Sequence, residues 1–434
     1  MHLHHSIIPL SLCLLFSCSA TDSNLESGVD RDNFDITVRP QDDFYRYVNG
    51  TWLDNTKIPE DQSTYGSFNA LRDKARDDVR AIIEESSKQK NLLEGSDSQK
   101  VGDLYNSFMD EESLEILGVS PVKLDLEEID KILDHDSLAV HFARMQKTRV
   151  DSPYGFYVSN DSKNPTEYIA YFGQSGLGLP EKAYYLNEDD KSKDLRSEYV
   201  GHLEKMFELF GFKEVKSIAS KVMAIETSIA KIHWTMVDRR DRDKTYNKLS
   251  TKDLMKLAPN LNWSFYLDEA GLANQEYFVV REKSYFSDFS NLFKLIHLED
   301  WKLYLKWKLI NSSAGSLNAE IDKQNFAFYG RILNGTPIQE ERWKRGTALI
   351  SGVLGEVIGK IYVERHFKPE AKDRMIELVE NLRVAYKEAI IDLDWMSDET
   401  KKQALDKLSK FKPKIGYPDK WKDYSGLEVG NNLM

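Results

Sequence analysis

Apolar residues recur every three or four positions along most of this chain, which is the spacing of one face of an α-helix. The clearest stripe is formed by Ile218, Val222, Ile225, Ile229 and Ile232. A second stripe is formed by Met375, Leu378, Val379, Leu382, Ala385 and Ala389. The same pattern predicts further helices over residues 67–86, 97–110, 191–211, 300–320 and 340–366. The sequence therefore predicts a mainly α fold.

Residues 397–410 predict one more helix from the chemistry of its two ends. Ser397 is a good N-cap, and two acidic residues follow it in the first turn. Lys407 and Lys410 lie near the other end, where positive charge complements the helix dipole. Pro413 then closes the segment.

Strand-like alternation is sparse. Residues 154–158 and 168–172 are rich in aromatic and β-branched side chains, and they predict a hairpin across residues 160–166. The following segment, Gly173–Pro180, has three glycines and a proline, which suit neither a helix nor a strand, so we expect a loop. The fold class predicted from these patterns is a large helical lobe with a small β element.

Composition and charge narrow the function classes. The chain has 434 residues, of which 41% are hydrophobic and 30% charged, as expected for a globular body with a substantial core. Its net charge of -12 repels phosphate backbones, so we expect no nucleic-acid partner. Both cysteines, Cys13 and Cys18, lie within the first twenty residues. The rest of the chain therefore has no disulfide and no cysteine metal site.

The first eighteen residues predict an export signal. The apolar run Ile7–Phe16 is shorter than the roughly 20 residues that span a bilayer, but it suits the central region of a signal peptide. Leu15–Cys18 resembles a bacterial lipobox, which makes Cys18 the candidate lipid-attachment residue. The alternative is an ordinary secretion signal that is cut near Ala20. Residues 19–39 are polar and read as a flexible tether, so we expect an exported protein on the periplasmic or cell-surface side of a bacterial membrane, held by a lipid anchor.

A series of motifs in a fixed order resembles one family of enzymes. The series opens with D-D-F-Y-R-Y-V-N-G-T-W at Asp42–Trp52. Further blocks follow at Ile58–Glu60, Tyr65–Phe68, Leu71–Asp73, Leu104–Asp110, Gln174–Pro180, Ala183–Leu186, Arg239–Asp241, Tyr246–Asn247, Phe326–Gly330, Arg342–Trp343, Asp394–Ser397, Thr400–Lys401 and Lys414–Asp419. The ordered set resembles the N-terminal region of the M13, or neprilysin-like, zinc metallopeptidases. Asn49-Gly50 stands where animal members have Cys-Gly, which indicates a bacterial-type member.

The resemblance implies a two-lobed, mostly helical enzyme in which a helical lobe roofs a closed cavity over the catalytic lobe. It implies that the family region runs over residues 40–424, with residues 40–71 partly in the catalytic lobe and residues 72–412 forming the helical roof. Residues 425–434 would begin the catalytic half. Such a roof limits access to the cavity, so the expected substrates are short, flexible peptides.

The resemblance also implies one zinc ion as cofactor, but the chain lacks the motif that would bind it. Zinc peptidases of this kind use H-E-x-x-H, in which two histidines one helical turn apart bind zinc and the glutamate acts as base. None of the nine histidines is followed by another four positions later. His366 has Glu364 nearby, but two residues apart they do not share a helix face. The expectation is that this chain carries no catalytic residue and no metal ligand, and that the zinc ligands lie beyond residue 434.

Two arginines are the candidate substrate contacts. Arg239 and Arg240 follow the isoleucine stripe directly, and a guanidinium facing the inner cavity could hold a peptide carboxylate. The competing interpretation is a solvated helix end with local ion pairs. Thr64 stands where some animal members have an arginine that holds the substrate's C-terminal end, which favours internal cleavage over removal of dipeptides.

We therefore predict the N-terminal portion of an exported zinc metalloendopeptidase, whose partners are short peptides, a C-terminal catalytic lobe absent from these residues, and a membrane contacted only through the lipid anchor. A truncated gene model or a partial sequence explains the end of the chain better than a natural stop. The alternative function is a non-catalytic, peptide-binding or scaffold lipoprotein derived from the roof. A solute-binding lipoprotein is disfavoured, because that class shows alternating strands and helices.

Overall fold

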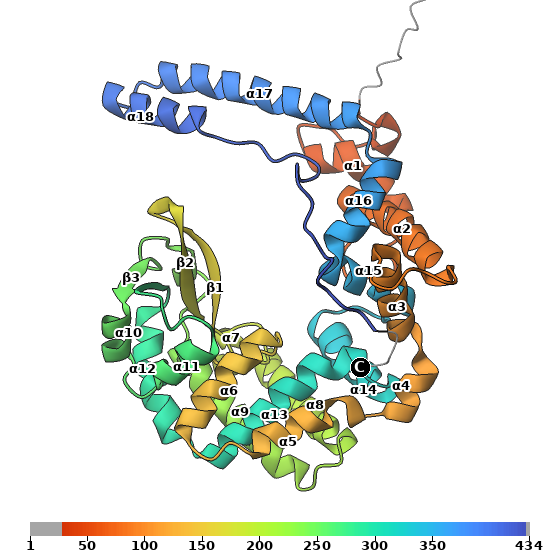
Figure 1. The fold of residues 1–434 in the computed structure, drawn as a ribbon. Coiled ribbons are helices and arrows are strands. Elements are labelled where there is room, and N and C mark those ends of the chain that lie inside the picture. Colours follow the sequence, from red (N-terminus) through yellow and green to blue (C-terminus); the bar gives the residue numbers. More distant parts are fainter. Residues whose placement is uncertain (1–27, 431–434) are drawn as a thin grey trace, which may run out of the picture. The chain divides into compact units, whose positions relative to one another are not determined.

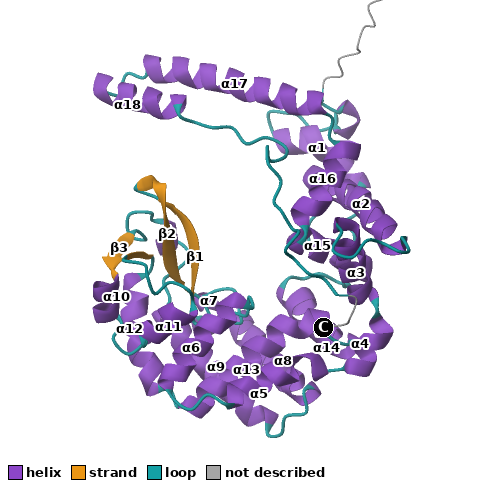
Figure 2. Ribbon diagram, viewed as in Figure 1, coloured by secondary structure: helices purple, strands orange, loops and turns teal. Residues whose placement is uncertain are grey.

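The computed structural model describes residues 28–430, so Cys18 and the rest of the predicted signal segment lie outside the described residues. The described chain falls into two compact units, divided between Ile58 and Pro59. Helices dominate both units, and strands occupy one small region of the second (Figures 1 and 2). This confirms the predicted mainly α fold class.

The first unit contains the 3₁₀ helix η1 (Arg31–Asn33) and the helix α1 (Phe44–Asn55). Asp43 caps α1 by accepting a hydrogen bond from the backbone of Arg46. The Asn-Gly step of the opening motif has a steric reason, because a Cβ on Gly50 would lie 2.4 Å from the Cβ of Asp35. Thr51 Oγ1 then donates to the carbonyl of Phe34 over 2.7 Å, which holds the segment before the helix against it.

The second unit contains the remaining helices and all the described strands. Its α-helices are α2 (Ser67–Lys88), α3 (Asp97–Met109), α4 (Glu111–Leu117), α5 (Lys123–Asp130), α6 (His135–Lys147), α7 (Lys182–Leu186), α8 (Asp190–Leu209), α9 (Val215–Ile232), α10 (Thr251–Leu257), α11 (Trp263–Glu269), α12 (Lys283–Leu295), α13 (Leu298–Ser313), α14 (Ala319–Phe326), α15 (Arg342–Val353), α16 (Gly355–His366), α17 (Pro369–Asp392) and α18 (Asp398–Ser409). Short 3₁₀ helices are η2 (Ser120–Val122), η3 (Asp238–Arg240) and η4 (Ala314–Ser316), and η5 (Ala327–Leu333) is a π-helix. The isoleucine stripe lies on α9 and the second stripe on α17, as predicted.

Two of the predicted helices are each broken into shorter ones. The segment 300–320 was predicted as one helix, but α13 ends at Ser313 and α14 begins at Ala319, where the side chain of Asn318 caps it by accepting from the backbone of Ile321. The segment 340–366 is α15 followed by α16, with a bend of 103° between them. Leu354, at the bend, is fully buried, so both helices turn their apolar faces to one core. No single described helix is long and apolar enough to cross a membrane, and α15 with α16 meets that criterion only as a bent pair.

The described strands form one four-stranded sheet in the order β1-β2-β4-β3. The predicted hairpin is confirmed as β1 (Tyr154–Asp161) paired antiparallel with β2 (Asn164–Gln174). β2 extends through Gln174, so the first two residues of the predicted loop belong to the strand. Two short strands were not predicted, β3 (Asn247–Ser250) and β4 (Tyr277–Val280), and β4 pairs parallel with β2.

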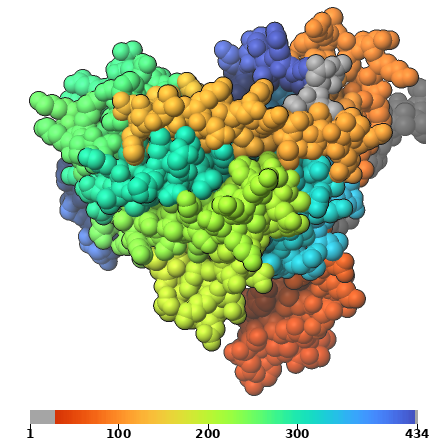
Figure 3. Space-filling view, turned by 90° about the horizontal axis from the view of Figure 1, so that it is seen from below, coloured from red at the N-terminus to blue at the C-terminus, as the bar shows by residue number. Residues whose placement is uncertain are grey.

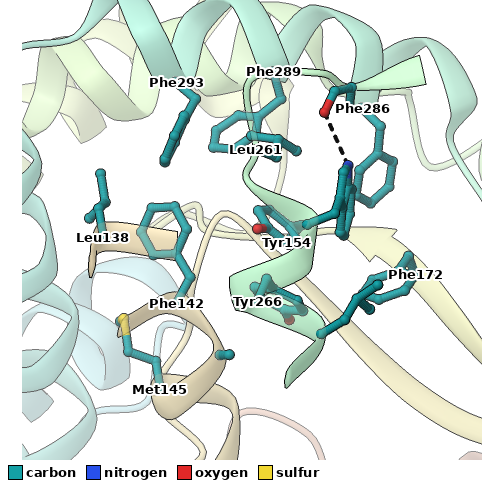
Figure 4. Packing of buried hydrophobic residues seen from close by; sticks show 14 of the residues in the cluster. Leu138, Phe142, Met145, Tyr154, Phe172, Leu261, Tyr266, Phe286, Phe289 and Phe293 are labelled. Atoms are coloured by element: carbon teal, nitrogen blue, oxygen red, sulfur yellow. Dashed lines mark hydrogen bonds between the residues drawn. The ribbon is translucent and has the colours of Figure 1, made fainter. Parts of the chain in front are cut away.

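The largest core is aromatic and packs between the sheet and the helices α6, α11, α12 and α13. Tyr154, fully buried, lies near its centre, with the ring of Phe142 6.0 Å away edge to face and the ring of Tyr266 5.0 Å away (Figure 4). Offset and edge-to-face aromatic pairs at such separations add to the stability that area burial alone supplies. This core fixes the sheet, and therefore the end of β2, on the helical body.

A second core lies where α8, α9 and α13 pack together with α14 and η5. On the outer surface of this part, α5 and α6 run along one side, and α13, α8 and α9 lie beside them (Figure 3). A third core joins α2 and α3 to α15 and α16. The first two cores share α9 and α13, which places these two helices at the middle of the helical body.

The helices α17 and α18 pack mainly on each other and bury none of their residues. The stripe predicted from sequence is therefore present on α17 but exposed, with Leu378 48% and Leu382 51% exposed. Phe411, after α18, is also exposed. The described residues do not cover this apolar face.

Candidate functional site

The two candidate arginines lie side by side on η3 but in different environments. The Arg239 side chain is 36% exposed, and its Nε donates to Oε1 of Glu282 over 3.1 Å. Glu282 is completely buried. Arg240 is exposed, and its guanidinium makes none of the ion pairs found among the described residues. The structure therefore separates the pair: Arg239 is held by a buried carboxylate, whereas Arg240 is exposed at the end of the 3₁₀ turn.

Arg239 lines a cavity of about 470 Å³ that we call the 174–182 groove. One side is the segment Gln174–Lys182, which leaves β2 and leads into α7. The opposite sides come from the segment after α9 and from the π-helix η5 with the residue that follows it. The lining residues from those two segments are His233, Trp234, Met236, Arg239, Tyr329, Leu333 and Asn334.

Glycines let the groove segment pass close to the core. Gly176 has a φ of +91°, and a Cβ there would lie 2.5 Å from Oη of Tyr304 and 2.6 Å from Cα of Pro153. A Cβ on Gly178 would lie 1.8 Å from Oη of Tyr199. Both positions therefore need glycine because the segment passes too close to the core for a Cβ atom. Gly176 needs it also because its backbone has a positive φ.

Buried tyrosines hold the backbone of this segment from below. Tyr304 Oη donates to the carbonyl of Gly176 over 2.7 Å, and Tyr329 Oη donates to the carbonyl of Gly178 over 3.2 Å. Tyr185 Oη accepts from the amides of Gly178 and Leu179, over 3.0 and 2.8 Å. Because these hydroxyls leave few backbone groups unpaired, the segment keeps one conformation although it contains no regular structure.

A buried ion pair anchors the tyrosines in turn. Glu226 on α9 and Lys308 on α13 are almost fully buried, and Lys308 Nζ lies 2.8 Å from Oε1 of Glu226. Oε2 of Glu226 accepts from Tyr185 and Tyr199, over 2.8 and 2.9 Å. Burial, reinforced by the Glu226 carboxylate, raises the pKa of both phenols well above the usual range. Both hydroxyls therefore stay protonated and act as donors to the carboxylate.

A second set of contacts joins the end of β2 to the segment after α9. The side-chain oxygen of Gln174 accepts from the amide of Trp234 over 2.7 Å, and its Nε2 donates to the carbonyl of Trp234 over 3.1 Å. The amide of Gln174 donates to Oε2 of Glu282 over 3.0 Å, while Oε1 of Glu282 accepts from Arg239. Glu282 therefore orients both the strand end and the arginine that faces the groove.

His233 closes one end of the groove as a neutral side chain. Its Nε2 lies 3.1 Å from the carbonyl of Ser175, which can only accept, so this nitrogen carries the proton. Burial lowers the pKa of His233 to about 4, and the hydrogen bond to Ser175 partly opposes that change. At neutral pH this residue therefore positions the groove segment and adds no charge.

A larger cavity of about 760 Å³ lies on the surface formed by α4, α5, α6 and α13. Its floor is apolar and includes Leu114, Val122 and Leu305. Neither of the candidate substrate contacts predicted from sequence, Arg239 and Arg240, lines this cavity. We therefore take the 174–182 groove as the candidate site, because it contains Arg239 and the glycine-bearing motif Gln174–Pro180.

The described residues contain no group of three or more His, Cys, Asp or Glu side chains that could hold a metal ion. His366 lies 3.8 Å from a carboxylate oxygen of Asp78, which is a single ion-pair contact. A zinc site needs three protein ligands and an open position for catalysis. No such ligand set occurs among residues 28–430.

Comparison with known proteins identifies the family. The model of peptidase family M13 matches residues 40–418, which include the groove and nearly all the sequence motifs. The chain belongs to peptidase family M13. This M13 chain is 26% identical to Neprilysin-3 of Drosophila melanogaster over 434 residues, and 27% identical to endothelin-converting enzyme 1 of Homo sapiens over 425 residues. Each match covers 94% of this chain and 54% of the relative.

Solved structures agree with the family. The crystal structure of the zinc metalloprotease Zmp1 of Mycobacterium tuberculosis, in complex with an inhibitor, superposes with a TM-score of 0.88 at 39% identity. It covers 93% of this M13 chain, which in turn spans 62% of Zmp1. PepO from Lactobacillus rhamnosis shares the fold, with a TM-score of 0.77 at 21% identity. The chain thus spans about half of the curated relatives' length and less than two thirds of Zmp1.

Several residues that shape the groove were not predicted from sequence. Glu226 is the one among them whose burial the sequence indicates. This carboxylate lies four residues after Val222, on the apolar stripe of α9, so it must have a buried partner. Nothing in the pattern around Lys308 or Glu282 indicates burial. Phe328 is 1% exposed in the second core, whereas its neighbour Tyr329 reaches both the core and the groove.

Proposed function

We propose that this M13 chain is the N-terminal portion of an exported zinc metalloendopeptidase that hydrolyses short peptides. The observation that carries the proposal is the family match over residues 40–418, supported by a fold shared with Zmp1, itself named a zinc metalloprotease. Function in such enzymes resides in a specific site and not in the fold. The proposal therefore separates what these residues do from what the rest of the protein supplies.

The residues that hold zinc are proposed to lie in the part of the relatives that this chain does not span. Zinc, when bound, polarises a carbonyl group and lowers the pKa of a bound water to about 7. The relatives extend well beyond the matched region, since the chain covers 54% of endothelin-converting enzyme 1 and 62% of Zmp1. This leaves ample length for an H-E-x-x-H helix and a third ligand, with the glutamate of the motif as general base.

The second unit, which begins at Pro59 and is called the helical unit below, is proposed to restrict access to the active-site cavity. Its three largest hydrophobic cores make it a body that can hold a fixed shape. A rigid roof admits a flexible peptide and excludes a folded domain, which explains why short peptides are the proposed substrates.

The exposed face of α17 and α18 supports a catalytic lobe as the partner. Leu378, Leu382 and Phe411 remain apolar although the described residues leave them exposed. Contiguous exposed apolar surface of this kind marks an interaction site. A free-standing binding or scaffold protein would carry polar residues here, so this observation disfavours the alternative function.

Export and anchoring remain proposals that rest on the first eighteen residues, which lie outside the described part. The apolar run Ile7–Phe16 and the lipobox-like Leu15–Cys18 support a lipid anchor at Cys18. The measurement is mass spectrometry of the mature N-terminus from a bacterial host. An acylated Cys18 supports the anchor, and a free N-terminus near Ala20 would favour simple secretion instead.

The test of the zinc peptidase proposal is to sequence the reading frame beyond the codon for Met434. We expect an open frame that encodes H-E-x-x-H and a downstream glutamate, and we expect the encoded protein to bind one zinc ion by metal analysis. A matched variant with the first motif histidine replaced by alanine should lose the zinc. A stop codon in intact DNA would overturn the proposal and leave the non-catalytic, peptide-binding or scaffold function.

A further inference from the structure

We propose that the 174–182 groove binds the C-terminal end of a short peptide, with its free carboxylate at Arg239 and Lys182 and an apolar side chain against Trp234 and Leu333. The ligand class rests on the proposed peptidase function. The groove would thus be a peptide subsite whose lining residues all belong to the helical unit.

The charges of the groove suit a single carboxylate. Glu282 is buried between two arginines, with Arg239 Nε at 3.1 Å and Arg281 Nε at 4.0 Å from its Oε1, which leaves one positive charge uncompensated. Lys182 and Glu181 also line the groove and carry opposite charges. The local balance is therefore about one positive charge, which a peptide's terminal carboxylate would neutralise.

Both cations have donors to spare. Arg239 uses its Nε for Glu282, and its two terminal nitrogens make none of the hydrogen bonds found among the described residues. Lys182 Nζ donates to the carbonyl of His233 over 2.6 Å and has two further protons. A guanidinium held by one buried carboxylate is fixed in direction, so a second carboxylate can meet it without loss of side-chain freedom.

The walls are rigid and of suitable size. The groove segment is fixed by Tyr185 and Tyr304, and a preformed site loses less entropy when a ligand binds. The facing wall is the π-helix η5, an element found frequently at functional sites. A volume of about 470 Å³ falls within the range of about 300–1,000 Å³ typical of small-ligand sites. This space holds the last residues of a peptide and excludes a folded protein.

The test is peptide binding by the full 434-residue chain, kept in mild detergent and measured by fluorescence anisotropy. The probe is an N-terminally labelled tetrapeptide of three alanines and a C-terminal leucine, used as the free acid and as the C-terminal amide. The free acid should bind at least about tenfold more tightly, since a hydrogen bond between charged groups supplies about 1.5 kcal/mol or more. This comparison uses the unaltered chain, so it does not depend on any variant folding.

Variants then locate the site. Arg239→Met should weaken binding of the free acid about tenfold and leave binding of the amide nearly unchanged. Lys182→Met should act in the same direction. Arg240→Met is the matched control, because Arg240 lies on the same 3₁₀ turn but outside the groove, and it should change neither affinity.

The proposal is overturned if the amide binds as well as the acid, if Arg239→Met and Arg240→Met behave alike, or if neither peptide binds. Its failure can be told apart from failure of the peptidase proposal. A groove that selects free acids in a protein whose complete reading frame lacks a zinc motif leaves a peptide-binding protein. An active zinc peptidase whose helical unit shows no preference leaves the enzyme without this subsite.

Discussion

Replacing Lys308 by methionine should destabilise the chain by about 3 kcal/mol. The Lys308 side chain is 2% exposed and its partner Glu226 is completely buried, so the variant leaves a carboxylate in the core without its counter-ion. Breaking a buried pair from one side costs about 3–5 kcal/mol. We expect the lower end of that range, because the hydroxyls of Tyr185 and Tyr199 still donate to Glu226, over 2.8 and 2.9 Å.

The assay is urea unfolding followed by far-ultraviolet circular dichroism, with the free energy of unfolding taken by linear extrapolation. The matched control is Lys306→Met on the same helix, whose partner Asp130 is 59% exposed. That substitution should cost no more than about 1 kcal/mol. The double variant Glu226→Gln/Lys308→Met should recover about 2 kcal/mol of the loss, since it removes the buried charge and keeps an acceptor for both hydroxyls.

The same variant should loosen the groove. Tyr185 accepts from the amides of Gly178 and Leu179 and is itself held by Glu226, so these two amide hydrogens should exchange faster in Lys308→Met. A loss below 1 kcal/mol for Lys308→Met, or a double variant no more stable than the single one, would refute the reasoning. In that case the ion pair would not be what anchors the groove segment.

Gly178→Ala should lower the free energy of unfolding in urea by about 3 kcal/mol, because its Cβ would lie 1.8 Å from Tyr199 Oη. The helical control Gly201→Ala has nothing within 4 Å of its Cβ and should raise the free energy of unfolding by about 0.5–1 kcal/mol. Equal effects of the two substitutions would contradict the close approach at Gly178. Burial lowers the pKa of His233 in the folded state to about 4 from 6.5. Its contribution to the free energy of unfolding is therefore fully present above pH 6.5, and up to about 3 kcal/mol of it is lost as the pH falls to 4. The urea midpoints of His233→Gln should therefore fall less between pH 7 and pH 4.5 than those of the unaltered chain, and parallel profiles would count against this. The side chain of Leu382 on α17 is 51% exposed. Leu382→Glu should therefore reduce self-association of the chain in sedimentation velocity and leave the melting temperature unchanged. A lowered melting temperature would show that the side chain is packed.

The helices could be predicted because their apolar residues repeat with the period of the element. The stripe of α9 indicates which face is buried, and the structure shows that Ile225 is buried. The hairpin could be predicted from its aromatic and β-branched residues, although burial along β1 does not alternate. The breaks at Leu354 and Asn318 could not be predicted in this way. Both sides of each break are apolar and helical, so the pattern continues while the chain turns to follow the core.

The sequence predicted only part of the groove, because the contacts that shape it join residues far apart in the chain. Arg239 and Arg240 are equivalent in sequence, and only the three-dimensional position of Glu282, some forty residues later, decides which of them faces the cavity. Likewise, Glu226 on the apolar stripe indicates a buried partner but does not name Lys308, 82 residues away. Local patterns report that a charge is buried, whereas the identity of its partner depends on how distant helices pack.

The central proposal is that this chain is part of a zinc peptidase that acts on short peptides, and hydrolysis tests this proposal most directly. The measurement is cleavage of a quenched fluorescent peptide of about ten residues by the protein encoded by the complete reading frame, beside the same sequence placed within a folded protein. The account predicts that the free peptide is cut internally, that the folded protein is not cut, and that a chelator abolishes cleavage until zinc is restored. Cleavage that persists without metal, or equal cleavage of the folded protein, would contradict it.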